Sequence, residues 1–285
     1  YGLSVINSHL LVGSKIVFNN HSVLEKKFWM DFKKYKVTSF AGVPFTYSLL
    51  IKLKNNYYYA KHFKYSTIAG GSLNNSDLKF LVNLYKNNKK KLIVMYGQTE
   101  ASPRISYVPW SKIQKKIGSI GKPISGGSLK INLFNSSNNT QTKTGEIIYC
   151  GPNVCLGYAN NFKDLKKDDE NKGILRTGDI GYIDSDGFAY ISGRLKRISK
   201  INGIRVNLDN IENQLAQKGI KCCLITNKNY LFFFITNKIY EKKIKFELIK
   251  KMNFNPTNVK TKIIEDFPLN SNGKINYTKL LKKIK

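Results

Sequence analysis

The sequence is poor in several residue types that mark common functional sites. Among its 285 residues are four cysteines and three histidines, and neither set shows the spacing of a zinc site or a redox motif. Cys222 and Cys223 lie in an apolar run, so we interpret the cysteines as reduced core residues of a cytoplasmic protein. No stretch approaches the roughly 20 apolar residues that a membrane helix needs. The composition therefore argues against a metal cage built by the protein and against a membrane span.

Acidic residues and arginine are scarce as well. Lysine and arginine together number 48 against 18 acidic residues, which gives a formal net charge of +30, and five of the 48 are arginine. Strongly basic chains often bind nucleic acid, but nucleic-acid readers favour arginine for bidentate contacts. The lysines are spread along the chain among asparagines, a pattern typical of biased gene composition. We expect no specific nucleic-acid partner, and a protein that binds polyanions through its lysines stays an alternative.

The spacing of apolar residues predicts three successive regions that differ in secondary structure. Helices and strands alternate first, as in a parallel sheet; short β-like runs follow, as in a small barrel or sandwich; and a compact α+β unit comes last. The expected helices are 22–35 with Ser22 as a possible N-cap, 76–88, 208–217, 241–252 and one near 277–284. The expected strands are 37–42, 92–95, 129–131, 146–149, 188–191, 222–226 and 230–236. The polar stretch 135–144 is expected to be a hairpin tip or loop.

One short motif follows directly after a buried strand. The apolar residues 92–95 lead into Tyr96-Gly97-Gln98-Thr99-Glu100, so the strand is expected to end in a tight turn. There the tyrosine can stack on a base, the threonine hydroxyl can reach a phosphate, and the glutamate can ligate Mg²⁺, which prefers oxygen ligands shared with substrate phosphates. By itself, the motif could also be an ordinary strand-end turn, with Tyr96 an ordinary half-buried aromatic.

Three further segments fit a nucleotide site in the same order. Asp179, in Arg176-Thr177-Gly178-Asp179, can accept both hydroxyls of a ribose, or can bond backbone amides in a turn. Arg194 can lie beside a ribose and a phosphate, or in a charged linker. Lys274 follows Gly273 in a loop near the last residue, where a lysine is ordinarily only solvated.

The ordered series resembles the adenylate-forming (AMP-binding) superfamily, which includes acyl-CoA synthetases, aryl-CoA ligases, peptide-synthetase adenylation domains and beetle luciferases. The resemblance covers essentially the whole chain, with family-like spacing. Its segments are Gly70-Gly71-Ser72, Tyr96–Glu100, Gly145-Glu146, Gly151, Gly157-Tyr158, Arg176–Asp179, Gly193–Lys196, Lys200, Gly203, Arg205, Pro268 and Gly273-Lys274.

The resemblance implies a two-step ligase. ATP and a carboxylic acid would give an acyl adenylate and pyrophosphate, and a thiol, usually of coenzyme A, would then displace AMP. Mg²⁺ would be held by Glu100. The other nucleotide contacts implied are Gly70, Gly71, Ser72 and Tyr96 around the adenine, Gly97 and Gln98 in the same turn, Thr99 on the α-phosphate, and Asp179 with Ile191 and Arg194 at the ribose.

The resemblance also implies a moving C-terminal part. Lys274 would bridge the carboxylate and the α-phosphate during the first step. Lys196 matches the hinge position about which the last domain rotates, and the loop of Lys200, Gly203 and Arg205 would replace Lys274 for thiol transfer. Three domains are implied: 1–115, the remaining part of the large α/β nucleotide- and acyl-binding domain; 116–195, a small β-barrel subdomain; and 196–285, a mobile α+β C-terminal domain.

One part of the family pattern has no counterpart in the sequence. The glycine-rich phosphate loop that should hold the β- and γ-phosphates would precede Tyr1, where the chain begins without a methionine or a leader. We expect an N-terminally truncated piece that depends on the missing N-terminal segment of the same enzyme and is inactive alone.

The acyl pocket is expected at Gly2, Val43 and Pro44. Relatives that activate amino acids carry an aspartate where this chain has Gly2, and a buried ammonium without a partner is costly. A fatty or aryl acid is therefore favoured. The alternatives are an amino-acid or carrier-protein adenylation domain, with a carrier-protein thiol in place of coenzyme A, and a non-catalytic remnant that binds AMP.

Overall fold

The computed structural model describes residues 1–133, 144–201, 204–251, 254–270 and 273–284. They form two compact units, and each is described by itself. The first unit comprises Tyr1–Thr177 and Gly181–Ile191, and the second comprises Gly178–Ile180 and Ser192–Lys285. The loop expected at 135–144 lies almost wholly outside the described residues.

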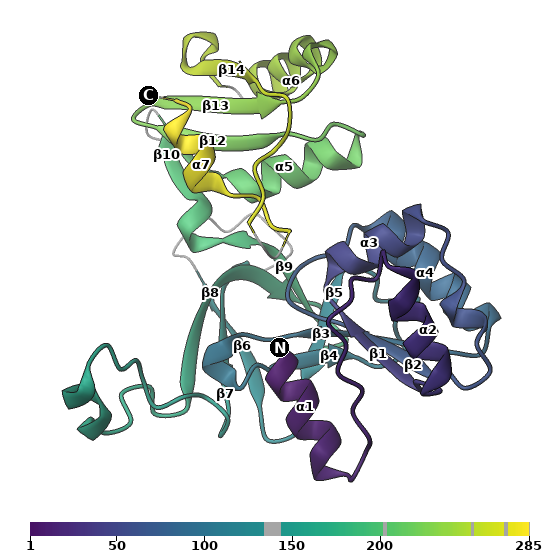
Figure 1. Cartoon of the computed structure of the whole chain (residues 1–285). Coiled ribbons are helices and arrows are strands. Elements are labelled where there is room, and N and C mark those ends of the chain that lie inside the picture. Colours follow the sequence, from purple (N-terminus) through teal and green to yellow (C-terminus); the bar gives the residue numbers. More distant parts are fainter. Residues whose placement is uncertain (134–143, 202–203, 252–253, 271–272, 285) are drawn as a thin grey trace. The chain divides into compact units, whose positions relative to one another are not determined.

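A nine-stranded mixed sheet positions the nucleotide motifs (Figure 1). The strands β1 to β3 are parallel, and β3 to β5 continue the sheet antiparallel. Parallel neighbours need a crossover connection, and helices supply it here. The strands, in their order across the sheet, are β1 (Ser39–Gly42), β2 (Tyr65–Ile68), β3 (Lys91–Tyr96), β4 (Ser106–Val108), β5 (Ser119–Pro123), β9 (Ala189–Arg194), β8 (Ile174–Ile183), β7 (Gly145–Cys150) and β6 (Ser128–Leu133).

Among the described residues of the first unit, four α-helices accompany the sheet. They are α1 (Gly2–Leu11), α2 (Lys26–Lys34), α3 (Pro44–Lys52) and α4 (Asn75–Asn87). Phe32 of α2, Tyr47 of α3 and Tyr85 of α4 are buried in one apolar cluster with strand residues such as Leu92. The Tyr85 hydroxyl donates to Ser66 Oγ on β2 at 2.7 Å, which satisfies a polar group that burial would otherwise penalise.

The start of α2 differs from the expectation. The helix begins at Lys26 and not near Ser22, and its N-cap is Glu25. The Ser22 amide donates to Glu25 Oε1 at 2.7 Å, and the Glu25 amide donates to the Ser22 carbonyl at 2.9 Å. These bonds close a turn over 22–25, and the extended backbone of Glu25 (φ −89°, ψ 136°) keeps that residue outside the helix.

The second unit contains a three-stranded sheet with helices on both faces (Figure 1). Leu231, Phe233 and Ile235 of β13 pack in the cluster that contains α5 and α6, whereas Phe234 packs with Leu280 of α7. This alternation is the period of two that a strand imposes. The elements are β10 (Ile198–Ile201), β11 (Ile204–Asn207), α5 (Leu208–Gln217), β12 (Cys223–Asn227), β13 (Tyr230–Ile235), α6 (Glu241–Phe246), β14 (Val259–Ile263) and α7 (Tyr277–Lys282).

The helix expected over 241–252 is shorter than predicted. Its α-helical part ends at Phe246, and 247–251 forms one wider π-helical turn. Glu247, only 6% exposed, pairs with Lys218 Nζ at 2.5 Å from this turn, while Leu248 stays in the core. A π turn changes the direction of the side chains that follow it, so a buried charge and a core residue can both be accommodated.

The β-rich stretch 116–195 does not form a sheet of its own. It contributes β5 to β9, and β5 joins them to β1–β4 because it pairs with both β4 and β9. The expected mixed α/β architecture is therefore confirmed. In the described part of the chain, no helix has both the length and the apolar character to span a membrane.

Candidate nucleotide-binding site

The Tyr96–Glu100 motif forms a tight turn at the end of β3, as expected. A Cβ at Gly97 would lie 1.6 Å from the carbonyl oxygen of Pro103, so this position accepts only glycine. A short 3₁₀ turn over Thr99–Ala101 follows, closed by a bond from the Ala101 amide to the Gln98 carbonyl at 2.9 Å. The turn leaves Thr99 exposed and Glu100 half-buried, so both side chains are open to a ligand.

Gln98 connects this turn to a distant segment. Its Nε2 donates to the Tyr96 hydroxyl at 3.2 Å and to the Thr177 carbonyl at 2.8 Å. Thr177 in turn donates its hydroxyl to the Ile147 carbonyl on β7 at 2.7 Å. The amide of Gln98 thus ties Tyr96 to β8, which carries the Arg176–Asp179 motif.

The neighbouring residues on β7 and β8 form an ion pair. Arg176 Nη2 lies 2.7 Å from Glu146 Oε2, and the Glu146 side chain is only 4% exposed. A carboxylate this deeply buried requires a cationic partner, and the arginine supplies it from the surface. Three predicted segments, 96–100, 145–146 and 176–177, are therefore brought together within the first unit.

Glu100 is held in its charged form. The Tyr158 hydroxyl donates to Glu100 Oε1 at 2.5 Å. This bond, assisted by a backbone amide, lowers the pKa of the Glu100 carboxyl below its ordinary value. A charged carboxylate beside an exposed threonine hydroxyl is the donor chemistry that suits Mg²⁺ shared with phosphates, so the residues present fit the expected cation.

One residue expected at the adenine, Gly70, lies next to Val43, which is expected in the acyl pocket. Gly70 has a left-handed backbone, and a Cβ built there would lie 3.6 Å from Val43 Cγ1. Val43 and Pro44 begin α3 and are half-buried, whereas Gly71 and Ser72 are exposed. Gly2 is exposed at the first turn of α1, with nothing within 4 Å of an added Cβ.

Asp179 belongs to the second unit and is buried there. It is 1% exposed, and Arg194 Nε lies 2.8 Å from its Oδ1. Arg194 is itself 62% exposed at the side chain, so the arginine covers the carboxylate from the solvent side. Ile191, expected beside them, is half-buried on β9 in the first unit.

The expected hinge and loop residues also lie in the second unit. Lys196 is exposed in the short turn Leu195–Arg197. Lys200 and Arg205 are directly opposite each other in the antiparallel pair β10–β11, and Gly203 lies outside the described residues. Lys274 is exposed on a hairpin closed by the Leu269–Ile275 bridge.

A largely buried polar cluster connects the Leu195–Arg197 turn to α5 and to Tyr277, the first residue of α7. Arg197 Nη2 lies 2.5 Å from Glu212 Oε1, and the Tyr277 hydroxyl donates to Glu212 Oε2 at 2.8 Å. The Arg197 guanidinium also lies 3.9 Å from the centre of the Tyr277 ring, and its Nε is 2.8 Å from Asp209 Oδ1. Burial raises the pKa of the Glu212 carboxyl, and the arginine opposes that rise.

Comparison with known proteins identifies the family. A family model described as AMP-binding enzyme matches residues 1–159, more than half of the chain. The chain belongs to the AMP-binding enzyme family.

Curated relatives of this AMP-binding chain are CoA ligases. The 2-succinylbenzoate–CoA ligase of Oceanobacillus iheyensis is 34% identical over 187 residues, which are 65% of this chain and 37% of that protein. The oxalate–CoA ligase of Arabidopsis thaliana is 29% identical over 63% of this chain and 35% of that protein. The matched regions therefore span little more than a third of the length of these relatives.

Solved structures of AMP-binding enzymes share the fold. The o-succinylbenzoate CoA synthetase of Bacillus subtilis, in complex with the acyl adenylate OSB-AMP, superposes with a TM-score of 0.72 at 19% identity, over 98% of this chain and 58% of that one. An anthranilate CoA ligase in complex with anthranoyl-AMP gives 0.66 at 21% identity, over 95% and 55%.

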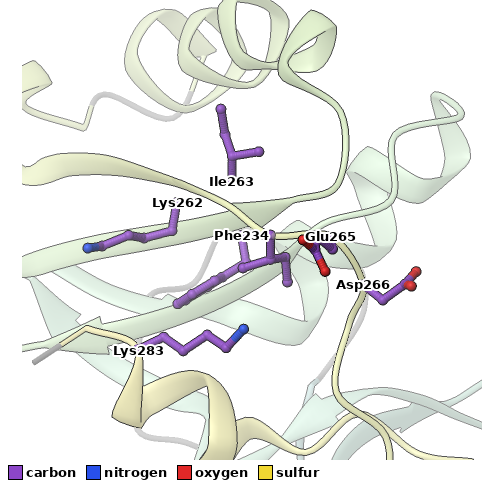
Figure 2. A pocket seen from close by; sticks show the side chains of 7 residues that line it. Phe234, Lys262, Ile263, Glu265, Asp266 and Lys283 are labelled. Carbon is purple, nitrogen blue, oxygen red and sulfur yellow. The ribbon is translucent and has the colours of Figure 1, made fainter.

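The AMP-binding chain has a separate hollow on its second unit (Figure 2). Its volume is about 620 Å³, and Phe234 lies between Lys262 and Lys283, with Glu265 and Asp266 further along. Charges of both signs line it, and its lining includes none of the residues expected at the nucleotide. We therefore place the candidate site at the Tyr96 turn and not in this hollow.

Several residues that hold the turn were not found from the sequence. Asn153 Nδ2 donates to the carbonyls of Ala101 at 2.6 Å and Arg104 at 2.8 Å, and Tyr149 donates its hydroxyl to Asn153 at 2.7 Å. The contact between Tyr158 and Glu100 spans 58 residues. The only signal in the sequence was the Gly157-Tyr158 pair within the family pattern, and that pair had no assigned role.

Proposed function

We propose that this chain is part of an AMP-forming acid–thiol ligase. The carboxylate of a carboxylic acid attacks the α-phosphorus of ATP, so that pyrophosphate leaves and an acyl adenylate forms. A thiol, which we assign to coenzyme A, then attacks the acyl carbon and expels AMP. The observation that carries the proposal is the convergence of the Tyr96 turn with the Glu146–Arg176 pair and Thr177.

In the proposed nucleotide site, these contacts fix the orientation of Tyr96, which we assign to the adenine. Gln98 holds the Tyr96 hydroxyl, so the ring is presented in one orientation for stacking. We assign the opposite wall to the segment Gly70–Ser72, in which glycine lets the backbone approach a ring closely. Thr99 extends from the exposed 3₁₀ turn toward the α-phosphate, where its hydroxyl can donate a hydrogen bond.

Glu100 is the residue that we assign to the magnesium ion. The ion, when bound, neutralises charge on the phosphates as pyrophosphate leaves. The part played by the chain is to keep the carboxylate ionised and in place, and the bond from Tyr158 supports both.

The ribose contact requires a local opening. Asp179 is assigned to the two ribose hydroxyls, yet in this structure it is covered by Arg194. Arg194 is mostly exposed, so its guanidinium can turn to a phosphate oxygen, and the two ribose hydroxyls then donate to the buried Asp179 carboxylate in its place. We propose this exchange as the step that admits the ribose.

The C-terminal residues are assigned to two alternating arrangements. We propose that residues 196–285 move as one domain about Lys196, and that residues 116–195 form a small barrel subdomain whose strands continue the sheet of β1–β4. Lys274 then stabilises the charge that develops as the carboxylate attacks, and the Lys200–Arg205 hairpin serves thiol transfer. The exposed turn at Lys196, a few residues after the main part of the second unit begins at Ser192, supports a domain boundary there.

The chain is proposed to need a further segment for activity. The curated relatives are much longer than the matched region, which agrees with an absent phosphate loop. We propose that an N-terminal segment of the same enzyme supplies the contacts to the β- and γ-phosphates. The substrate is proposed to be an aryl or fatty acid, because Gly2 offers no anion for an amino group and Val43 and Pro44 are apolar.

The proposal is tested by exchange of labelled pyrophosphate into ATP. The full-length protein that contains this chain is incubated with Mg²⁺, ATP and single carboxylic acids, with aryl acids, fatty acids and amino acids as separate arms. Exchange of pyrophosphate that requires an aryl or fatty acid supports the proposed ligase. Nucleotide binding without exchange for any acid would instead support a non-catalytic remnant, and exchange confined to amino acids would support an adenylation domain.

A further inference from the structure

The contact between Tyr158 and Glu100 is short and unusual for its surroundings. The hydroxyl lies 2.5 Å from Glu100 Oε1, yet Tyr158 is 67% exposed. An exposed ring contributes little burial energy, so packing does not account for its place. The hydrogen bond is the interaction that fixes the ring against the turn.

The segment that carries Tyr158 is anchored to the same turn. The Cys155 amide donates to the Glu100 carbonyl at 2.8 Å, and Asn171 Nδ2 donates to the Cys155 carbonyl at 2.7 Å. The Glu170 amide donates to the Leu156 carbonyl at 2.8 Å. The backbone on each side of Leu156 is thus tied down, and Tyr158, two residues on, is held within reach of the carboxylate.

The contact leaves Glu100 able to bind a cation. A carboxylate offers about four lone-pair directions, and the Tyr158 hydroxyl uses one of them on Oε1. A donor on one oxygen restricts rotation of the carboxylate and so orients its remaining lone pairs. Metal-binding carboxylates commonly have such partners, and their loss typically reduces metal affinity by about 10–100-fold.

We propose that Tyr158 is a positioning residue that orients Glu100 for Mg²⁺. The proposal rests on the assignment of Glu100 to the metal in the proposed function. Tyr158 acts through the carboxylate and does not touch the ion or the nucleotide. It connects the end of the 145–158 segment to the residue that we assign to the metal.

Mn²⁺ binding tests the proposal without turnover. Mn²⁺ is titrated into the full-length protein saturated with the α,β-methylene analogue of ATP, and free Mn²⁺ is measured by electron paramagnetic resonance. Tyr158→Phe is expected to raise the Mn²⁺ dissociation constant about 10-fold. Tyr107→Phe, which removes the hydroxyl of another exposed tyrosine of the same unit, is the matched control and is expected to leave it unchanged.

The variant Glu100→Gln tests the assignment of Glu100 to the metal separately from the role of Tyr158. If Glu100→Gln weakens Mn²⁺ binding and Tyr158→Phe behaves like wild type, the role of Tyr158 is refuted and that of Glu100 stands. If Glu100→Gln also binds Mn²⁺ like wild type, the assignment of the metal to Glu100 fails together with the inference.

A second readout distinguishes positioning from a structural role. In pyrophosphate exchange, Tyr158→Phe is expected to raise the Mg²⁺ concentration at half-maximal rate, and saturating Mg²⁺ is expected to restore kcat to about the wild-type value. A loop that had lost its fold would lower kcat at every Mg²⁺ concentration. A lowered kcat at saturation, with an unchanged Mg²⁺ requirement, would overturn the proposal.

Discussion

Replacing Arg197 with methionine is expected to destabilise the second unit strongly. The Arg197 and Glu212 side chains are each 14% exposed and lie 2.5 Å apart. Removing one partner of a buried pair costs about 3–5 kcal/mol, because the other charge stays buried. Glu212 keeps the Leu224 amide at 2.6 Å and the Tyr277 hydroxyl at 2.8 Å. We therefore expect the lower end, about 3 kcal/mol, or roughly 100-fold in the opening equilibrium.

Hydrogen exchange measures this change locally. In Arg197→Met, the slow amides of α5 and β12 are expected to exchange roughly 100-fold faster, while those of α4 in the first unit keep their wild-type rates. Lys245→Met is the control, because its ion pair with Glu241 lies at the surface and should contribute only about 0.2–1 kcal/mol. Equal exchange in α5 and β12 for the two variants would refute the reasoning.

The effect of Arg197→Met is also expected to depend on pH. Burial raises the pKa of Glu212, and Arg197 opposes that rise, so the variant raises it further. For a carboxyl whose pKa is raised on folding, stability is fully present below the unfolded pKa, about 4.3, and is lost as pH rises through the folded pKa. For the amides of α5 and β12, the exchange rate in the variant divided by that in the wild type should therefore be smallest near pH 4 and increase toward neutral pH. A ratio that is constant with pH would contradict this cause.

Three further predictions concern the site and the thiols. Gly97→Ala should reduce acyl-adenylate formation about 100-fold or more, because the added Cβ would clash with the carbonyl oxygen of Pro103 and displace the turn. Near-normal activity would contradict this clash. Lys274→Ala should slow pyrophosphate exchange by about 10²–10³, whereas thioester formation from supplied acyl adenylate should persist; equal loss of both steps would refute the assignment. Burial raises the pKa of the Cys222 thiol to about 12 and raises that of Cys223, so iodoacetamide at pH 8 should label the half-buried Cys150 and Cys155 before these two; equal labelling of all four cysteines in mass spectrometry would contradict this.

Local patterns in the sequence predicted the elements that carry the site. The apolar run at 92–95 became the core of β3, and the turn after it is where the motif placed it. Helix 208–217 was predicted to the residue from the apolar spacing of Leu208, Ile211 and Leu215 and from the glycine at 219. The family pattern identified the AMP-binding family, which the match over residues 1–159 confirms.

The errors and omissions come from contacts between distant residues or from competing local bonds. Helix α2 starts late because Glu25 bonds back to Ser22, a competition that periodicity alone does not weigh. The bonds from Gln98 to Thr177 and from Tyr158 to Glu100 join residues 79 and 58 positions apart. No local rule pairs such residues, so only the folded chain reveals them.

Isotope transfer from the acid to AMP tests the central claim most directly. The full-length protein is given ATP, Mg²⁺, coenzyme A and a carboxylic acid labelled with ¹⁸O in both carboxylate oxygens, and the products are analysed by mass spectrometry. Attack of the carboxylate on the α-phosphorus, followed by thiol attack on the acyl carbon, must leave one ¹⁸O in AMP. The account predicts this singly labelled AMP together with the thioester. Thioester formed with unlabelled AMP, or with the label in inorganic phosphate, would contradict it.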